Sequence, residues 1–177
     1  MNSQDRTALV ILVPEAEPLV KEFRDRYDPS AAKGMPAHVT VLYPFKYVNE
    51  IGKDVVDALQ TLFSRYLRFS FTLEETRRFP TTLYLAPQPE ALFQELTQAV
   101  AERYPETPPY EGAFSTVVPH LTIAQVGDSQ ELDKISDGFD RASRGRLPIH
   151  SSAEKVWLME KEEGKWKPRL SFAFNIG

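Results

Sequence analysis

The segment Pro36-Ala-His-Val-Thr-Val-Leu-Tyr-Pro-Phe45 decides the fold, together with a second segment of the same pattern, Pro119-His-Leu-Thr-Ile123. Each places a histidine and a threonine two positions apart in a β-rich run of strand length. Side chains two positions apart lie on the same face of a strand. We therefore expect each strand to bury aliphatic residues on one face and to present an imidazole and a hydroxyl on the other.

The elements predicted around these two segments follow the same order twice. The series begins first at Ala8 and again at Thr81. Each time it consists of a strand, a helix, a proline-containing loop, the His-x-Thr strand, a helix and a further strand. Pro14 and Pro87 close the first strand of each copy. The copies match in pattern rather than in residue identity. This pattern predicts one α+β domain over residues 1–177, made of two lobes that each hold a small sheet with helices on one face.

Hydrophobic periodicity and turn residues place the individual elements. Strands are predicted at 8–13, 38–43, 69–73, 81–86, 119–123, 156–159 and 170–176. Helices are predicted at 15–27, from an N-cap at Asn49 to Phe63, at 89–104, and from Asp128 to Phe139. Residues 141–146 are interpreted as a loop, and residues 160–167 as a solvated hairpin tip.

Composition excludes several classes of protein. The 177 residues are 42% hydrophobic and 26% charged, which is typical of a globular domain. The absence of cysteine excludes disulfides, iron–sulfur clusters and thiol nucleophiles. A net charge of −4 does not suit a protein that binds bulk nucleic acid. No apolar run is long enough to span a membrane, and the start does not resemble a secretory signal, so a cytoplasmic location is expected.

The histidine pair has the chemistry of acid–base catalysis. Only three histidines are present, and His150 has no threonine two positions later. Imidazole titrates near pH 6.5, so one neutral and one protonated ring can coexist near neutral pH. One ring could activate an attacking oxygen and the other could protonate a leaving oxygen. The two threonine hydroxyls could donate hydrogen bonds to non-bridging phosphate oxygens.

These residues resemble a known family. The two His-x-Thr segments are similar to the paired motifs of the 2H phosphoesterase superfamily, especially its 2′-5′ RNA ligase-like or cyclic phosphodiesterase-like group. Phe79-Pro80 before one predicted strand and Trp157-Leu-Met-Glu160 in another also fit. The resemblance covers nearly the whole chain, and its short motifs are specific because they occur as a pair.

The resemblance implies a fold, an activity and a set of site residues. It implies a pseudo-twofold α+β fold in which mainly antiparallel sheets carry helices on their outer faces and the motifs face a central cleft. His38 and His120 would be the acid and base, and Thr40 and Thr122 would bind the phosphate. The expected reaction opens 2′,3′-cyclic phosphates, or cleaves 2′-5′ linkages, without a metal or other cofactor. The expected partner is a nucleotide or RNA end, with no DNA and no membrane, and the expected state is a monomer.

Substrate contacts outside the two motifs are less defined. Tyr43 and Phe45 could stack on a base, although core packing is the usual role of aromatic residues. Arg78, with Arg77, could reach a phosphate, although a solvated turn is an equal alternative. Residues 141–146 form a basic stretch that could guide RNA or simply be solvated.

Two other functions are consistent with the same residues. A 2′-5′ RNA ligase would run the same bond chemistry in the joining direction. A non-catalytic module would bind RNA or a nucleotide in the cleft without turnover. Both motifs retain histidine and threonine, which favours an enzyme over a module that only binds.

Overall fold

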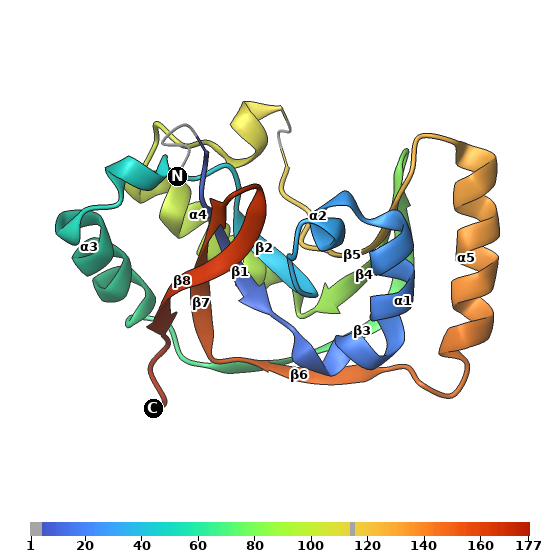
Figure 1. Ribbon diagram of the computed structural model, residues 1–177. Coiled ribbons are helices and arrows are strands. Elements are labelled where there is room, and N and C mark those ends of the chain that lie inside the picture. Colours follow the sequence, from blue (N-terminus) through green and yellow to red (C-terminus); the bar gives the residue numbers. More distant parts are fainter. Residues whose placement is uncertain (1–4, 114–115) are drawn as a thin grey trace.

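Antiparallel strands in two sheets form the framework of the protein (Figure 1). The structure, a computed structural model, describes residues 5–113 and 116–177. Within these ranges, one four-stranded sheet has the order β2-β1-β7-β8 and the other has the order β5-β4-β3-β6. The strands are β1 (Ala8–Leu12), β2 (His38–Leu42), β3 (Phe69–Phe79), β4 (Thr82–Gln88), β5 (Leu121–Gln125), β6 (Ile149–Ala153), β7 (Lys155–Glu162) and β8 (Lys165–Ala173).

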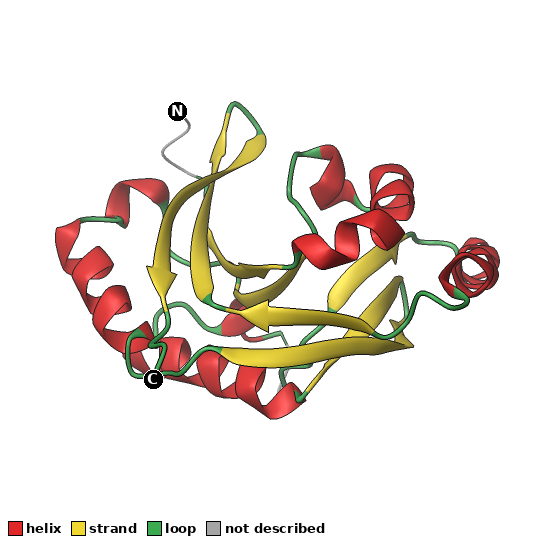
Figure 2. Ribbon diagram, turned by 90° about the horizontal axis from the view of Figure 1, so that it is seen from below, coloured by secondary structure: helices red, strands yellow, loops and turns green. Residues whose placement is uncertain are grey.

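Amphipathic helices pack on these sheets, as Figure 2 shows from below. They are α1 (Glu17–Tyr27), α3 (Lys53–Phe63), α4 (Glu90–Arg103) and α5 (Ser129–Ser143). The four-residue helix α2 (Pro29–Ala32) has no buried residue and lies against α1. The 3₁₀ turns are η1 (Pro14–Ala16), η2 (Val48–Glu50) and η3 (Pro109–Gly112). In α3, Val55, Leu59 and Phe63 recur every four residues and are buried. None of the helices in the described ranges is both long and apolar enough to cross a membrane.

The two halves of the chain exchange their first helices. Helix α1 joins β1 to β2 of the first sheet, but it packs against β5 of the second sheet. Helix α4 joins β4 to β5 of the second sheet, but it packs against β2 of the first. Strand β3 also follows the first half in the chain and pairs with β4 and β6 of the second sheet. The predicted two-lobed α+β fold is confirmed, and its lobes are interlocked.

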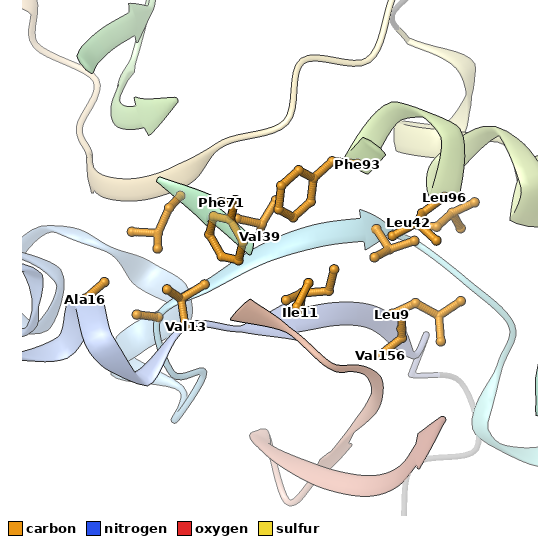
Figure 3. Close-up of a cluster of buried hydrophobic side chains, with 14 of the residues drawn as sticks. Leu9, Ile11, Val13, Ala16, Val39, Leu42, Phe71, Phe93, Leu96 and Val156 are labelled. Atoms are coloured by element: carbon orange, nitrogen blue, oxygen red, sulfur yellow. The ribbon is translucent and has the colours of Figure 1, made fainter. Parts of the chain in front are cut away.

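The main core lies on the face of the strands opposite the histidines. Val39 of β2 is fully buried there, as are Leu9 and Ile11 of β1 (Figure 3). Phe71 of β3 and Phe93 of α4 meet edge to face, with ring centroids 5.1 Å apart. Burying one such side chain contributes about 1.5–3 kcal/mol, so this core holds the two histidine strands from behind.

Several element boundaries differ from the sequence prediction. The helix expected from Asn49 begins at Lys53, because Val48–Glu50 form the 3₁₀ turn η2 and Gly52 is the N-cap. Helix α5 extends to Ser143 and so includes Arg141. Strand β6 was not predicted, because two adjacent serines and a single large aliphatic residue, Ile149, give a weak strand signal. Strands β3, β7 and β8 are longer than the apolar runs that predicted them.

Candidate active site

The two His-x-Thr strands lie side by side at the junction of the lobes. Strands β2 and β5 are the end strands of their sheets and are in contact, although they are not paired in one sheet. His38, Thr40, His120 and Thr122 all line one cleft of about 280 Å³. All four side chains are partly exposed, and the aliphatic residues between them are buried. The alternation expected from the sequence therefore brings the four motif residues together.

Each histidine ring is oriented by a backbone carbonyl two residues before it. His38 Nδ1 lies 2.7 Å from the carbonyl oxygen of Pro36, and His120 Nδ1 lies 2.8 Å from that of Val118. A carbonyl oxygen can only accept, so Nδ1 carries the proton in both rings. In the neutral state, Nε2 is then the nitrogen with a free lone pair. Both rings thus keep the same nitrogen for proton transfer in the cleft.

Burial holds both imidazoles toward the neutral form. It lowers the pKa of His38 to about 4, and the positive charge of Arg24 acts in the same direction. Burial also lowers the pKa of His120, against the opposing effects of the Val118 carbonyl and Asp28. The charge of a protonated His120 also acts to lower the pKa of His38, as the smallest of the effects on this ring.

The two rings have different neighbours. His120 meets the aromatic rings of Phe79 and Tyr84 at centroid distances of 5.2 and 5.4 Å, with an edge-on geometry. His38 instead lies next to a buried ion pair between Arg24 and Asp28, whose charges act on its pKa. The symmetric motifs are therefore set in unequal surroundings.

A wall of aromatic and basic side chains completes the cleft. Tyr43 and Trp166 line it and contact each other edge to face, with centroids 6.0 Å apart. The Lys161 ammonium lies 4.9 Å from the centre of the Trp166 ring, and Lys33 also lines the cleft. Tyr110 lies on the same lining, and its backbone N–H donates to the Tyr43 carbonyl at 2.8 Å. Burial raises the pKa of Tyr110 to about 12, so its hydroxyl stays protonated.

Sequence reasoning missed most of this wall. The stretch 160–167 was expected to be solvated, but Trp166 is only 8% exposed and lies against the cleft. Its backbone N–H donates to the Lys33 carbonyl at 2.7 Å, which fastens the β7–β8 hairpin to the loop before β2. The tryptophan within this charged hairpin was the signal that the hairpin packs against other residues, because an indole ring usually buries a large apolar area.

Two of the further candidates do not lie in the cleft. Phe45 is fully buried in the main core and packs against Tyr104 at 5.4 Å, so core packing is its role and stacking on a base is not available to it. Arg78 lies within strand β3 rather than in a turn, and it forms an exposed ion pair with Asp133. It is not among the residues that line the cleft. His150 is exposed in β6, away from the other two histidines.

Three other hollows on the described surface are lined by other residues than those of the two motifs. One of about 640 Å³ lies between α1 and α5 and has a mixed charged lining that includes Arg26, Glu131 and Lys134. Chemistry therefore identifies the smaller cleft as the candidate active site. In residues 5–113 and 116–177, no three His, Asp or Glu side chains are grouped to hold a metal ion.

Sequence comparison places the chain in a family. Residues 12–165 match the 2′-5′ RNA ligase superfamily, and the chain belongs to this superfamily. The comparison with curated proteins finds no match.

Solved structures with similar folds agree with this assignment. Escherichia coli LigT complexed with 3′-AMP is 15% identical and has a TM-score of 0.60, with 96% of this chain and 98% of LigT covered. A structure described as a phosphoesterase is 16% identical with a TM-score of 0.60, covering 97% of this chain and 98% of its own. TT0787 of Thermus thermophilus is 17% identical with a TM-score of 0.56, covering 95% of this chain and 97% of its own. The protein therefore has the fold of LigT and related phosphoesterases.

Proposed function

We propose that the protein is a metal-independent phosphoesterase that opens 2′,3′-cyclic phosphates, or cleaves 2′-5′ linkages, in nucleotides and RNA ends. The proposal is carried by one observation: both His-x-Thr pairs line the same cleft, with equivalent nitrogens of the two rings held by backbone carbonyls. Membership in the 2′-5′ RNA ligase superfamily supports the class of reaction.

The hydrolysis needs one base and one acid. The neutral histidine accepts a proton from water at Nε2, and the water oxygen forms a bond to phosphorus. The bond from phosphorus to the 3′ oxygen breaks, and the protonated histidine gives its Nε2 proton to that oxygen. The product carries a 2′-phosphate and a free 3′-hydroxyl. Each positioned ring is worth about 10²–10⁴-fold in rate.

Thr40 and Thr122 are proposed to bind the non-bridging phosphate oxygens. Each hydroxyl lies on the same face of its strand as the histidine, one pleat further along. Hydroxyls fixed on strands can donate to an oxygen as its charge increases, without reorganising during the reaction. Each motif thus supplies one histidine for proton transfer and one threonine hydroxyl for stabilising negative charge on the phosphate.

The nucleoside would lie along the wall formed by Tyr43, Trp166 and Lys161. This wall offers aromatic surface and a positive charge in the same cleft as the phosphate site. LigT was crystallised with 3′-AMP, with ATP and with NADP⁺, which supports a nucleotide as the ligand of this cleft.

A product assay tests the proposal. The protein is incubated with EDTA and with 2′,3′-cyclic nucleotides, cyclic-phosphate oligonucleotides and 2′-5′-linked dinucleotides. We expect turnover that EDTA does not reduce, with the phosphate retained on the 2′ oxygen of the cyclic substrates. Turnover abolished by EDTA and restored by a divalent cation would contradict the metal-independent reaction.

The same assay separates the two alternatives. Joining of RNA ends is the reverse of cleaving a 2′-5′ linkage, so a ligase would convert paired RNA ends carrying a cyclic phosphate and a 5′-hydroxyl into 2′-5′-linked product. A module that only binds would show saturable binding of 3′-AMP and no product with any substrate. We expect hydrolysis to exceed joining, because water is in large excess over RNA ends.

A further inference from the structure

A buried ion pair lies directly behind the first histidine. Arg24 of α1 is 2% exposed and Asp28 is 4% exposed, and Arg24 Nε donates to Asp28 Oδ2 at 3.0 Å. Removing two charges from water is costly, and apolar residues of similar volume often stabilise a fold at least as well. Fold stability alone therefore does not account for this pair, and its position next to the cleft suggests a role there.

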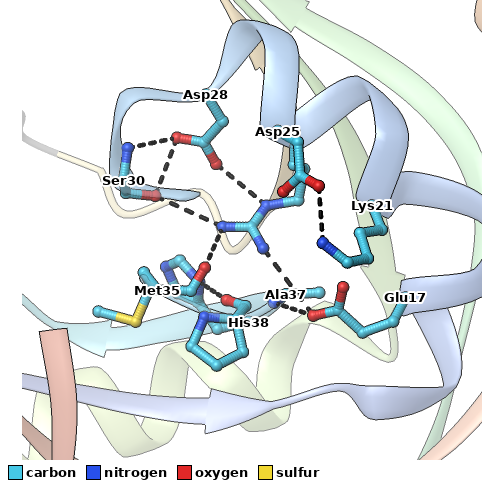
Figure 4. Close-up of polar contacts among 10 residues, drawn as sticks. Glu17, Lys21, Asp25, Asp28, Ser30, Met35, Ala37 and His38 are labelled. Atoms are coloured by element: carbon cyan, nitrogen blue, oxygen red, sulfur yellow. Dashed lines mark hydrogen bonds and ion pairs between the residues drawn. The ribbon is translucent and has the colours of Figure 1, made fainter. Parts of the chain in front are cut away.

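The pair holds the segment that leads into β2 (Figure 4). Arg24 Nη2 donates to the Met35 carbonyl at 2.9 Å. Asp28 Oδ1 accepts from the backbone N–H of Ser30 at 2.9 Å and from its hydroxyl at 2.8 Å. At the far end of the segment, Glu17 Oε1 accepts from the backbone N–H of Ala37 at 2.6 Å.

These contacts hold the residues on both sides of Pro36, whose carbonyl orients the His38 ring. Pro36 lies between Met35, which Arg24 holds by its carbonyl, and Ala37, which Glu17 holds by its N–H. The Pro36 carbonyl accepts the Nδ1 proton of His38 at 2.7 Å. A movement of the segment would therefore displace the acceptor that orients the imidazole, although β1 still pairs with His38. Glu17 Oε1 also lies 4.0 Å from Arg24 Nη1, so the contacts to Met35 and to Ala37 belong to one polar network.

His120 is held in a different way. Its carbonyl partner is Val118, and its ring packs edge-on against the stacked rings of Phe79 and Tyr84 rather than next to an ion pair. The charged groups that act on His38 are Arg24, Asp28 and His120, and the cleft lining adds Lys33 and Lys161. Of this set, Arg24 also binds the backbone of Met35, three residues before His38, and Asp28 binds both Arg24 and Ser30 at the start of the segment.

We infer that Arg24 and Asp28 are positioning residues for His38: their buried ion pair fixes residues 30–37, and so sets the orientation of one catalytic imidazole and not of the other. The inference rests on the proposed catalytic role of His38, but its geometric part concerns the ring itself. It can therefore be tested with or without turnover.

Nuclear magnetic resonance titration of the histidine rings tests the geometric part. The chain contains three histidines, so each ring can be assigned by a single substitution. In Arg24→Met, loss of the neighbouring positive charge is expected to raise the pKa of His38. In Asp28→Asn, which keeps an oxygen for Ser30, loss of the negative charge is expected to lower it. The ring resonances of His150, which is exposed in β6, are the control and should keep their positions at neutral pH in both variants.

Kinetics on the same variants test the catalytic part. Arg24→Met is expected to lower kcat by up to about 100-fold with a much smaller change in KM, because a misplaced reacting group affects the transition state more than binding. Arg24→Lys should recover part of kcat, since an ammonium restores the charge but cannot bind both partners in the same geometry. Arg26→Met is the matched control, because Arg26 lies on the same helix in an exposed pair with Glu22.

Opposite shifts of the His38 pKa in the two variants, with a loss of kcat that Arg26→Met does not share, would support the inference. If His38 titrates as in the wild type in both Arg24→Met and Asp28→Asn, the pair does not position it and the inference is wrong. If Arg24→Met does not fold, Asp28→Asn alone tests the inference, and an unchanged His38 pKa in that variant would again contradict it. Opposite shifts without turnover in the wild type would contradict the proposed function and leave the positioning intact.

Discussion

At the scale of single residues, the proposed acid and base are two imidazoles that burial holds toward the neutral form. His38 and His120 have the same tautomer and line the same cleft, and burial lowers the pKa of both. An anionic phosphate entering between them would favour protonation of one ring. The substrate itself would thereby help to create the acid that the reaction needs.

Removal of either motif histidine should abolish most activity. We expect His38→Ala and His120→Ala each to lower kcat/KM by about 10²–10⁴-fold, because each removes one positioned proton-transfer group. His150→Ala is the control, since His150 is exposed in β6 and should leave activity unchanged. Initial rates with a 2′,3′-cyclic nucleotide measure the effect. Wild-type activity in either motif variant would contradict the acid–base assignment.

The lowered pKa of His38 should make stability depend on pH. Between pH 6.5 and about 4, the unfolded chain binds a proton at His38 that the folded protein excludes. The contribution of neutral His38 to the free energy of unfolding should therefore be complete above pH 6.5. It should decrease as the pH falls from 6.5 to about 4. The loss from this residue is at most about 3 kcal/mol.

Urea unfolding at pH 7 and pH 4.5 measures this dependence. His38→Gln should show a smaller difference between the two pH values than the wild type, whereas His150→Gln should not. An equal difference in the wild type and His38→Gln would show that the folded protein does not exclude the proton.

At the scale of elements, the histidine strands are held by helices from the opposite half. Thr97 of α4 is 3% exposed, and its hydroxyl donates to the carbonyl of Val41 in β2 at 2.6 Å. Val41 lies on an end strand, where a carbonyl has no second strand to pair with on the outer side. The exchanged helix therefore satisfies a polar group of the strand that carries His38.

Breaking this contact should destabilise the fold measurably. Thr97→Val keeps the shape of the side chain but leaves the Val41 carbonyl without its hydroxyl donor, at an expected cost of about 1–3 kcal/mol. Thr61→Val, at an exposed position of α3, is the control and should change stability by less than about 0.5 kcal/mol. Chemical denaturation of the three proteins provides the comparison. A cost in Thr97→Val no larger than in the control would contradict the proposed helix–strand contact.

The β7–β8 hairpin should report on occupancy of the cleft. The chain has two tryptophans, and Trp157→Phe leaves Trp166 as the single indole. Because Trp166 lines the cleft, 3′-AMP is expected to change its fluorescence in a saturable way. Trp166→Phe, which retains the partly exposed Trp157, should show no saturable change. A response of Trp157 instead would place the nucleotide elsewhere.

The local sequence pattern was enough to predict which face of the strand carries the motif residues. It did not predict the residues that surround them. The two-residue period placed His38 and Thr40 on one face because a strand imposes that period wherever it lies. Arg24 and Asp28 could not be recognised, because charges four residues apart on a helix usually belong to a solvated face. Whether such a pair is buried depends on which segment packs over it, and that contact is made by residues 30–37.

At the scale of the whole molecule, the interlocked lobes should behave as one folding unit. The sequence repeat indicated two lobes, but it could not show that α1 and α4 pack on the sheets of the opposite halves. That arrangement depends on contacts between residues far apart in the chain, which local patterns do not contain. Strand β3 likewise pairs with the second sheet although it belongs to the first repeat.

A fragment of residues 1–80 should therefore fail to fold alone. It would lack β7 and β8 of the first sheet, and it would expose the apolar face of α1 that packs on β5. The intact chain should unfold in a single cooperative transition. Circular dichroism of the fragment and coincident unfolding curves of the whole chain measure these outcomes. A fragment with native-like cooperative unfolding would show that the lobes are independent.

The exchange of α1 and α4 also limits how the cleft can move. In a protein whose two halves are joined only by a linker, a hinge can open and close around the ligand. Here each half contributes a helix to the other, so a hinge motion would pull both helices off their sheets and expose core residues on both sides. For the proposed reaction, we therefore expect that the separation of His38 and His120 is set before substrate binds and that turnover does not wait for domain closure.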